Sequence, residues 1–78
     1  MKITIKLFAT LRKYLGEDTR GTGTLDLPEG MNVCQLLDQL EIPKEIPKIV
    51  LINDQQKTME TTLKQGDTLS VFPPIAGG

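Results

Sequence analysis

The sequence contains no histidine and one cysteine, Cys34. Without imidazole, the chain has no side chain that ordinarily titrates near neutral pH, and a Cys-His pair or a His-ligated metal is excluded. A single thiol forms neither an intramolecular disulfide nor a thiolate metal cluster. We therefore predict no metal site in this chain and a reducing compartment, the cytoplasm.

Aromatic residues and long apolar runs are also scarce. Phe8, Tyr14 and Phe72 supply every aromatic ring, so we expect a core of Ile, Leu and Val, in which an exposed ring would be informative. No apolar run approaches about 18 residues, and the first residues already show a strand pattern, so neither a membrane span nor a signal peptide is expected.

The charges of this 78-residue chain nearly balance, with nine basic and ten acidic residues. One domain is expected at this length, and without a basic surplus we predict no nucleic-acid partner. Residues 16–41 carry six acidic side chains against Arg20 alone: Glu17, Asp18, Asp26, Glu29, Asp38 and Glu41. This segment either steers a basic partner or forms an ordinary solvated face.

Alternation of apolar and polar residues predicts the first two strands. In residues 2–8, Ile3, Ile5 and Leu7 share one face and Phe8 falls on the other. A short helix or turn is predicted over 9–15 and a polar loop over 17–23. Residues 24–27 alternate again and are expected to pair antiparallel with the first strand.

Residues 32–40 carry the signature of an amphipathic helix. Asn32 is a good N-cap, and Gln35 completes an amide version of the capping box. The apolar residues that follow lie on one stripe: Val33, Leu36, Leu37 and Leu40. Cys34 lies on the flank of this stripe, as a small packing residue or, near the helix N-terminus, as a reactive thiol.

The second half of the chain predicts three more strands. Residues 49–52 are apolar on both faces, so this strand is covered on each side or its outer face meets another molecule. We predict a short edge strand over 56–59, a helical turn over 61–63, and a last strand over 68–72. In that last strand Leu69 and Val71 point inward, and Ser70 and Phe72 point outward.

These elements predict an α+β fold, with a mixed sheet of four to five strands and one main helix packed on one face. If the first and last strands are adjacent and parallel, Phe8 and Phe72 both lie on the uncovered side. Together with Pro73 and Ile75 they would form an apolar patch, which typically marks a partner surface.

The carboxyl-terminal residues predict a slender tail. Pro73 and Pro74 remove two backbone donors where a strand finishes, so we expect a domain over 1–73 and a tail over 74–78. Gly77 and Gly78 carry no side chain, and the tail can therefore enter a narrow channel. The Gly78 carboxylate is a poor electrophile, and acyl chemistry would require activation by a partner's nucleotide. Alternatively, the two glycines are merely a frayed end.

Three motifs carry a resemblance that covers essentially the whole chain. They are residues 5–12 (IKLFATLR), residues 28–30 (PEG) before the helix, and residues 63–67 (LKQGD) before the last strand. With the Phe72-Pro73-Pro74-Ile75-Ala76-Gly77-Gly78 ending, the chain resembles the ubiquitin-like sulfur carriers of the MoaD and ThiS family, and most closely the MoaD group. The resemblance implies the ubiquitin-like β-grasp fold. Thiamine-pathway carriers usually lack the Phe-Pro-Pro lead and rank second.

The resemblance also implies a function for the tail. Gly78 would be adenylated by an E1-like enzyme of the MoeB or ThiF type, using ATP that this chain does not itself bind. It would then be thiocarboxylated from a sulfur donor such as a cysteine desulfurase or a rhodanese. Inside a MoaE-like large subunit, the thiocarboxylate would donate sulfur for molybdopterin.

In that assembly each residue of the tail region has an implied place. The channel of the partner would hold the tail, and the two phenylalanines would contact its surface; the residues are Pro73, Pro74, Ile75, Ala76, Gly77, Phe8 and Phe72. The carrier alone would catalyse nothing. A thiamine-pathway carrier, a protein modifier attached to lysines, and a plain interaction domain remain the alternative functions.

Overall fold

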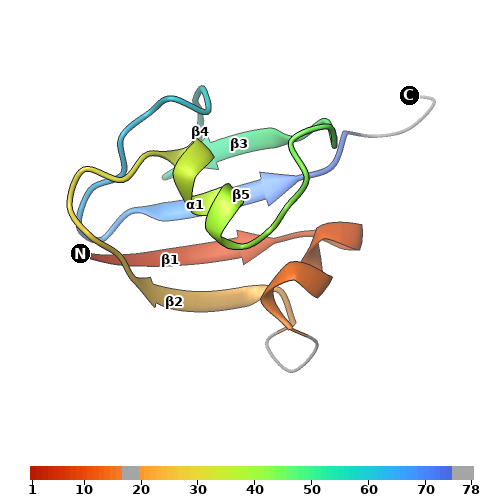
Figure 1. Ribbon diagram of the computed structural model, residues 1–78, viewed down its shortest axis with the longest axis horizontal. Helices are drawn as coiled ribbons and strands as arrows, with labels where there is room; N and C mark the ends of the chain where they lie inside the picture. The colour runs from red at the N-terminus through yellow and green to blue at the C-terminus, as the bar shows by residue number, and fades with distance from the viewer. Residues whose placement is uncertain (17–19, 75–78) are drawn as a thin grey trace.

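The computed structural model describes residues 1–16 and 20–74, which form one mixed sheet and two helices (Figure 1). In chain order the elements are β1 (Lys2–Leu7), the 3-10 helix η1 (Ala9–Leu15), β2 (Thr22–Asp26), α1 (Val33–Gln39), β3 (Ile49–Ile52), β4 (Gln55–Gln56) and β5 (Thr68–Phe72). The strand order is β2-β1-β5-β3-β4, and α1 lies across one face of the sheet. The predicted α+β class is confirmed.

The core lies between α1 and the inward face of the sheet. Alternation along β1 buries one face of that strand, and Leu69 and Val71 of β5 are buried in the same core, as predicted from the sequence. The core is formed by side chains of β1, η1, α1, β3 and β5 and of three connecting segments: Ile3, Ile5, Leu7, Leu11, Leu27, Val33, Leu36, Leu37, Ile42, Val50, Ile52, Leu63, Leu69 and Val71. Aliphatic burial on this one side leaves the opposite face of the sheet without a helix.

Helix α1 begins with the predicted capping box. The Asn32 side chain accepts a hydrogen bond from the backbone amide of Gln35 at 2.8 Å. In return, the Gln35 side chain accepts one from the backbone amide of Asn32 at 2.9 Å. These bonds satisfy backbone donors that the first helical turn leaves unpaired. The helix ends at Gln39, with Leu40 as its C-cap, so the predicted stripe is buried through Leu37 and half-buried at Leu40.

The strands β1 and β5 are neighbours in the middle of the sheet and run parallel. In the sequence, all the other elements lie between them. Their register places Ile5 beside Leu69 and Leu7 beside Val71. The remaining pairs are antiparallel, including the predicted pairing of β1 with β2. Because β1 and β5 are parallel, their carboxyl ends emerge at the same end of the sheet (Figure 1).

Two predicted strands have different bounds in the structure. Strand β2 starts at Thr22, two residues early, because Thr22 pairs with Lys6 of β1. The edge strand β4 covers Gln55–Gln56 instead of 56–59, since it closes a two-residue hairpin through Asn53 and Asp54, both at positive φ.

The predicted helical turn over 61–63 is wrong. Thr62 forms an isolated antiparallel bridge with Asn32 instead, and the neighbouring Val33 amide donates to the Thr61 carbonyl at 3.1 Å. The segment therefore pairs with the start of α1, a tertiary contact that its local sequence does not encode.

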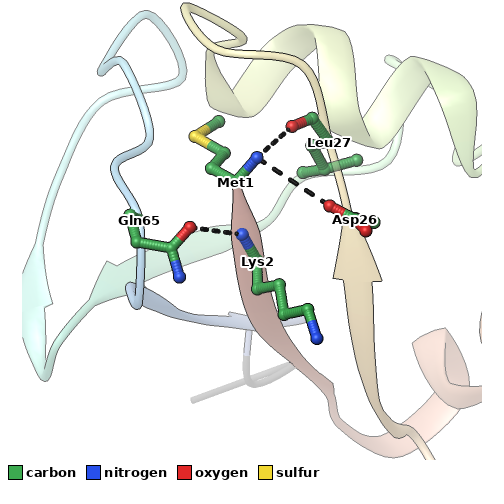
Figure 2. A network of polar contacts seen from close by, with 5 residues as sticks. All are labelled: Met1, Lys2, Asp26, Leu27 and Gln65. Carbon is green, nitrogen blue, oxygen red and sulfur yellow. Dashed lines mark hydrogen bonds and ion pairs between the residues drawn. The ribbon is translucent and has the colours of Figure 1, made fainter.

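The amino end of β1 is bound on both sides at the other end of the sheet (Figure 2). The Met1 amino group donates to the Leu27 carbonyl at 2.6 Å and lies 3.9 Å from the Asp26 carboxylate. The Lys2 amide donates to the Gln65 side-chain oxygen at 2.9 Å. These contacts tie β1 to the segments that follow β2 and precede β5.

Candidate functional site

The root of the tail lies where β5 ends. Phe72 is its last residue, Pro73 is half-buried and Pro74 is exposed. The Phe8 amide donates to the Val71 carbonyl at 3.1 Å, which holds the end of β5 against the end of β1. The remaining predicted tail residues, Ile75, Ala76, Gly77 and Gly78, lie outside the described residues, and the predicted division at 73/74 stays a prediction.

Phe8 and Phe72 stack at this point. Their ring centroids are 4.2 Å apart with an angle of 12° between the ring planes. The parallel register explains the contact, because Leu7 is paired with Val71 and each phenylalanine follows one of these residues. The prediction that both rings lie on the uncovered side, near the tail, is confirmed.

Strand β3 extends this apolar surface. Ile49 pairs directly with Phe72, so the two side chains share a face, and Ile49 is 39% exposed. Leu51 follows on the same face and is half-buried, whereas Val50 and Ile52 point into the core. We call Phe8, Ile49, Leu51 and Phe72 the open-face patch.

The sequence of β3 carries a signal for this extension that is compatible with two interpretations. Residues 49–52 are apolar on both faces, which fits either a strand covered on each side or an outer face that meets another molecule. The structure places core residues under one face of β3, while the other face remains partly exposed. Within the described residues β3 is thus not covered on both faces, and contact of its outer face with another molecule stays a prediction.

Polar residues continue the open face away from the patch. Ser70, predicted to point outward, is 8% exposed because its neighbours in register, Lys6 and Leu51, flank it on both sides. Lys6 itself is exposed and places a positive charge on this face. An apolar partner surface with an acidic neighbour would fit this arrangement.

The described residues include no cluster with the composition of a catalytic or metal centre. Cys34 is half-buried in the first turn of α1, and its backbone amide donates to the Met59 carbonyl at 2.9 Å, which agrees with a packing role. Among residues 1–16 and 20–74, no three His, Cys, Asp or Glu side chains are placed to hold a metal ion. In the same ranges no helix is long and apolar enough to cross a bilayer.

Comparison with known families decides the class of this chain. The profile of the ThiS family matches residues 5–78, nearly the whole sequence. The chain belongs to the ThiS family. It is a ubiquitin-like sulfur carrier of the ThiS and MoaD type. The matched range includes β5, Pro73 and Pro74, and the two final glycines. A search of curated proteins found no match.

Solved structures support the ThiS-family fold. SAMP1 from Haloferax volcanii is 25% identical, with full coverage of both chains and a TM-score of 0.75. A putative molybdopterin converting factor subunit 1 from Pyrococcus furiosus is 24% identical over 96% of this chain and 99% of its own, with a TM-score of 0.75. The β-grasp fold is therefore confirmed.

A third ThiS-like neighbour comes from a protein complex. It belongs to a complex of subunits 1 and 2 of the molybdopterin-converting factor from Helicobacter pylori, with 19% identity, full coverage of both chains and a TM-score of 0.64. Ubiquitin-like domains of this shape are thus found with protein partners.

Proposed function

We propose that this ThiS-family chain is the sulfur-donating small subunit of molybdopterin synthase. The observation that carries the proposal is the stacked pair Phe8 and Phe72 on an open apolar face, at the point where Pro73 and Pro74 lead out of the sheet. A rigid aromatic anchor beside the tail root fixes the direction in which the tail enters a partner. The Phe-Pro-Pro lead favours the molybdopterin pathway over the thiamine pathway.

The chemistry is centred on the Gly78 carboxyl group. Attack of this carboxylate on the α-phosphate of ATP, bound by an E1-like enzyme, releases pyrophosphate and forms an acyl-adenylate. The outer sulfur of a persulfide on a cysteine desulfurase or a rhodanese attacks the acyl carbon and displaces AMP, and reduction of the resulting acyl disulfide by a thiol releases the thiocarboxylate. Residues 73–77 act as a narrow arm, and exclusion of water by the partner's channel protects the acyl-adenylate from hydrolysis.

Transfer takes place when the tail enters a MoaE-like large subunit. The thiocarboxylate sulfur is the nucleophile, and the large subunit supplies the acid, the base and the contacts to the pterin precursor. This chain, which we place in the cytoplasm, contributes the sulfur and the docking surface. It binds no cofactor of its own in this scheme.

Intact-mass analysis tests this proposal. Protein isolated from its native cell, or produced beside its activating enzyme, is expected to gain the mass difference of sulfur replacing oxygen, located on Gly78. A variant lacking Gly78 is the matched control and should show no gain. If the unmodified mass persists in the presence of active enzyme, ATP and sulfur donor, the proposal is wrong.

Likeness to SAMP1 favours a second function, that of a protein modifier. SAMP1, the small archaeal modifier protein 1 of Haloferax volcanii, matches this chain over its full length at 25% identity. The same activated tail would then form an amide with lysines of other proteins. Digestion of cell extract with trypsin separates the two functions, because a modifier leaves residues 65–78, the peptide that follows Lys64, attached to target lysines and a sulfur carrier does not.

A further inference from the structure

A basic pocket is lined by residues of η1 and of the segment before β2. The helix η1 lies at the end of the sheet where β5 ends (Figure 1). It has a volume of about 360 Å³, and Arg12, Lys13 and Arg20 line it. We use the name basic pocket for the space between these three side chains, all of which are exposed. Glu17 and Asp18, which come between them in the sequence, lie outside the described residues.

Arg12 is held in place at the pocket wall. Its Nε donates to the Ala9 carbonyl at 3.3 Å, and its aliphatic stem lies against Gly21. A Cβ at position 21 would collide with that stem and with the Leu7 carbonyl, so the close approach requires glycine. In the part of the chain that the structure describes, no carboxylate pairs with Arg12, Lys13 or Arg20. A fixed guanidinium with unused donors is ready to bind an acidic group.

The backbone around the pocket is unusual for its residue types. Ala9 and Arg20 both have left-handed backbone, with φ of 54° and 55°, and both line the pocket. Non-glycine residues adopt this conformation at an energetic cost, and such strain clusters at binding sites. Left-handed backbone at two pocket-lining positions indicates that the surrounding structure holds the loop shape.

We propose that the basic pocket receives acidic side chains of the enzyme that activates the tail. This proposal rests on the function proposed above and adds the ionic half of the docking surface. Phe8 of the open-face patch directly precedes η1, and the Leu11 amide donates to the Phe8 carbonyl at 3.1 Å. The apolar anchor and the basic pocket are therefore neighbouring parts of one surface, which orients the carrier about the tail root.

A triple variant in which glutamine replaces the three basic side chains tests the pocket against a matched control. The variant Arg12→Gln/Lys13→Gln/Arg20→Gln and the control Lys2→Gln/Lys57→Gln/Lys64→Gln each remove three positive charges. The control lysines lie at the start of β1 and in the segment after β4, away from η1. Calorimetry with the activating enzyme is expected to show affinity reduced about tenfold for the pocket variant and less than about twofold for the control.

Salt dependence provides a second readout of the same contacts. Affinity of the wild type should fall as salt rises, and the pocket variant should lose most of that dependence. Equal affinity and equal salt dependence for the pocket variant and the control would overturn the proposal. Thermal midpoints close to that of the wild type are expected for both variants, because all six side chains are exposed.

A titration of the free carrier distinguishes an acidic protein segment from a free anion. A hexaglutamate peptide should shift the backbone amide resonances of residues 9–16 and 20–21, and inorganic phosphate should do so weakly at best. Saturable binding of phosphate without binding of the peptide would overturn the proposal in favour of a small-anion site. A negative result in these titrations would leave the sulfur carrier function standing, because that function is tested separately by the mass gain at Gly78 in the wild type.

Discussion

Phe8 and Phe72 lie face to face with their ring centroids 4.2 Å apart, although Phe8 directly follows the first strand and Phe72 ends the last. The contact forms because β1 and β5 pair in parallel, which brings the carboxyl ends of both strands to one end of the sheet. As a result, the only two phenylalanines of the sequence lie together at the root of the tail. Their position suits partner binding more than core stability.

Replacement of Phe72 by alanine is expected to weaken partner binding strongly. Loss of a central aromatic anchor typically costs about 2 kcal/mol or more of binding free energy, which is roughly 30-fold in affinity. The free energy of unfolding should fall by only about 1 kcal/mol, since the ring lies outside the main core. Calorimetry with the large subunit and urea denaturation measure the two quantities.

A double-mutant cycle with Phe8→Ala tests whether the two rings act as one unit. Stacked aromatic pairs contribute about 0.5–1.5 kcal/mol beyond the area that they bury. Unfolding free energies of the single and double variants should therefore be non-additive by this amount. Additive effects on both unfolding and binding would show that the two rings contribute independently.

Ile49 and Ile52 offer a matched pair within strand β3. Ile49 is 39% exposed on the open-face patch, and Ile52 is 6% exposed in the core. Ile52→Ala is expected to lower the unfolding free energy by about 2–5 kcal/mol. Ile49→Ala should change stability by about 0.5 kcal/mol and should still weaken partner binding. Unchanged partner affinity for Ile49→Ala would remove it from the patch.

Gly21 is expected to be intolerant of any side chain. Its φ is +80°, and an added methyl group would meet the Leu7 carbonyl and the Arg12 stem. Gly30 has a similar φ of +87° with open space around it, so Gly30→Ala isolates the backbone cost of about 1–2 kcal/mol. Gly21→Ala should cost about 1–3 kcal/mol more because of the steric overlap. Equal melting temperatures for the two variants would contradict this reading.

The local patterns of the sequence predicted most of this fold because they act over a few residues. Alternation assigned the buried faces of β1 and β5, and the Asn32 and Gln35 pair located the start of α1. The stacking of the rings was also predictable, because it follows once the first and last strands are parallel neighbours. The family motifs at the tail added the class of chemistry.

Features that depend on tertiary pairing were not predictable in this way. The bridge between Thr62 and Asn32 replaces the expected helical turn, because the start of α1 offers backbone groups to that segment. Burial of Ser70 depends on side chains from two neighbouring strands. Arg12 and Arg20 line the basic pocket from two sides of a turn. The shape of the pocket depends on the close approach of Gly21 to the Leu7 carbonyl and the Arg12 stem, which no periodicity of the sequence reveals.

Deletion of Gly78 is expected to abolish sulfur loading and leave the fold unchanged. The described core ends at Val71, and the last strand ends at Phe72, so removal of the final residue takes no side chain from the packed interior. The melting temperature should match that of the wild type, while the mass gain at the carboxyl end and synthase turnover should both be lost. A variant extended by one alanine after Gly78 is the matched control, because it keeps both glycines and displaces the reactive carboxyl group. Measurable turnover by either variant would show that the Gly78 carboxyl group is not the sulfur-bearing site.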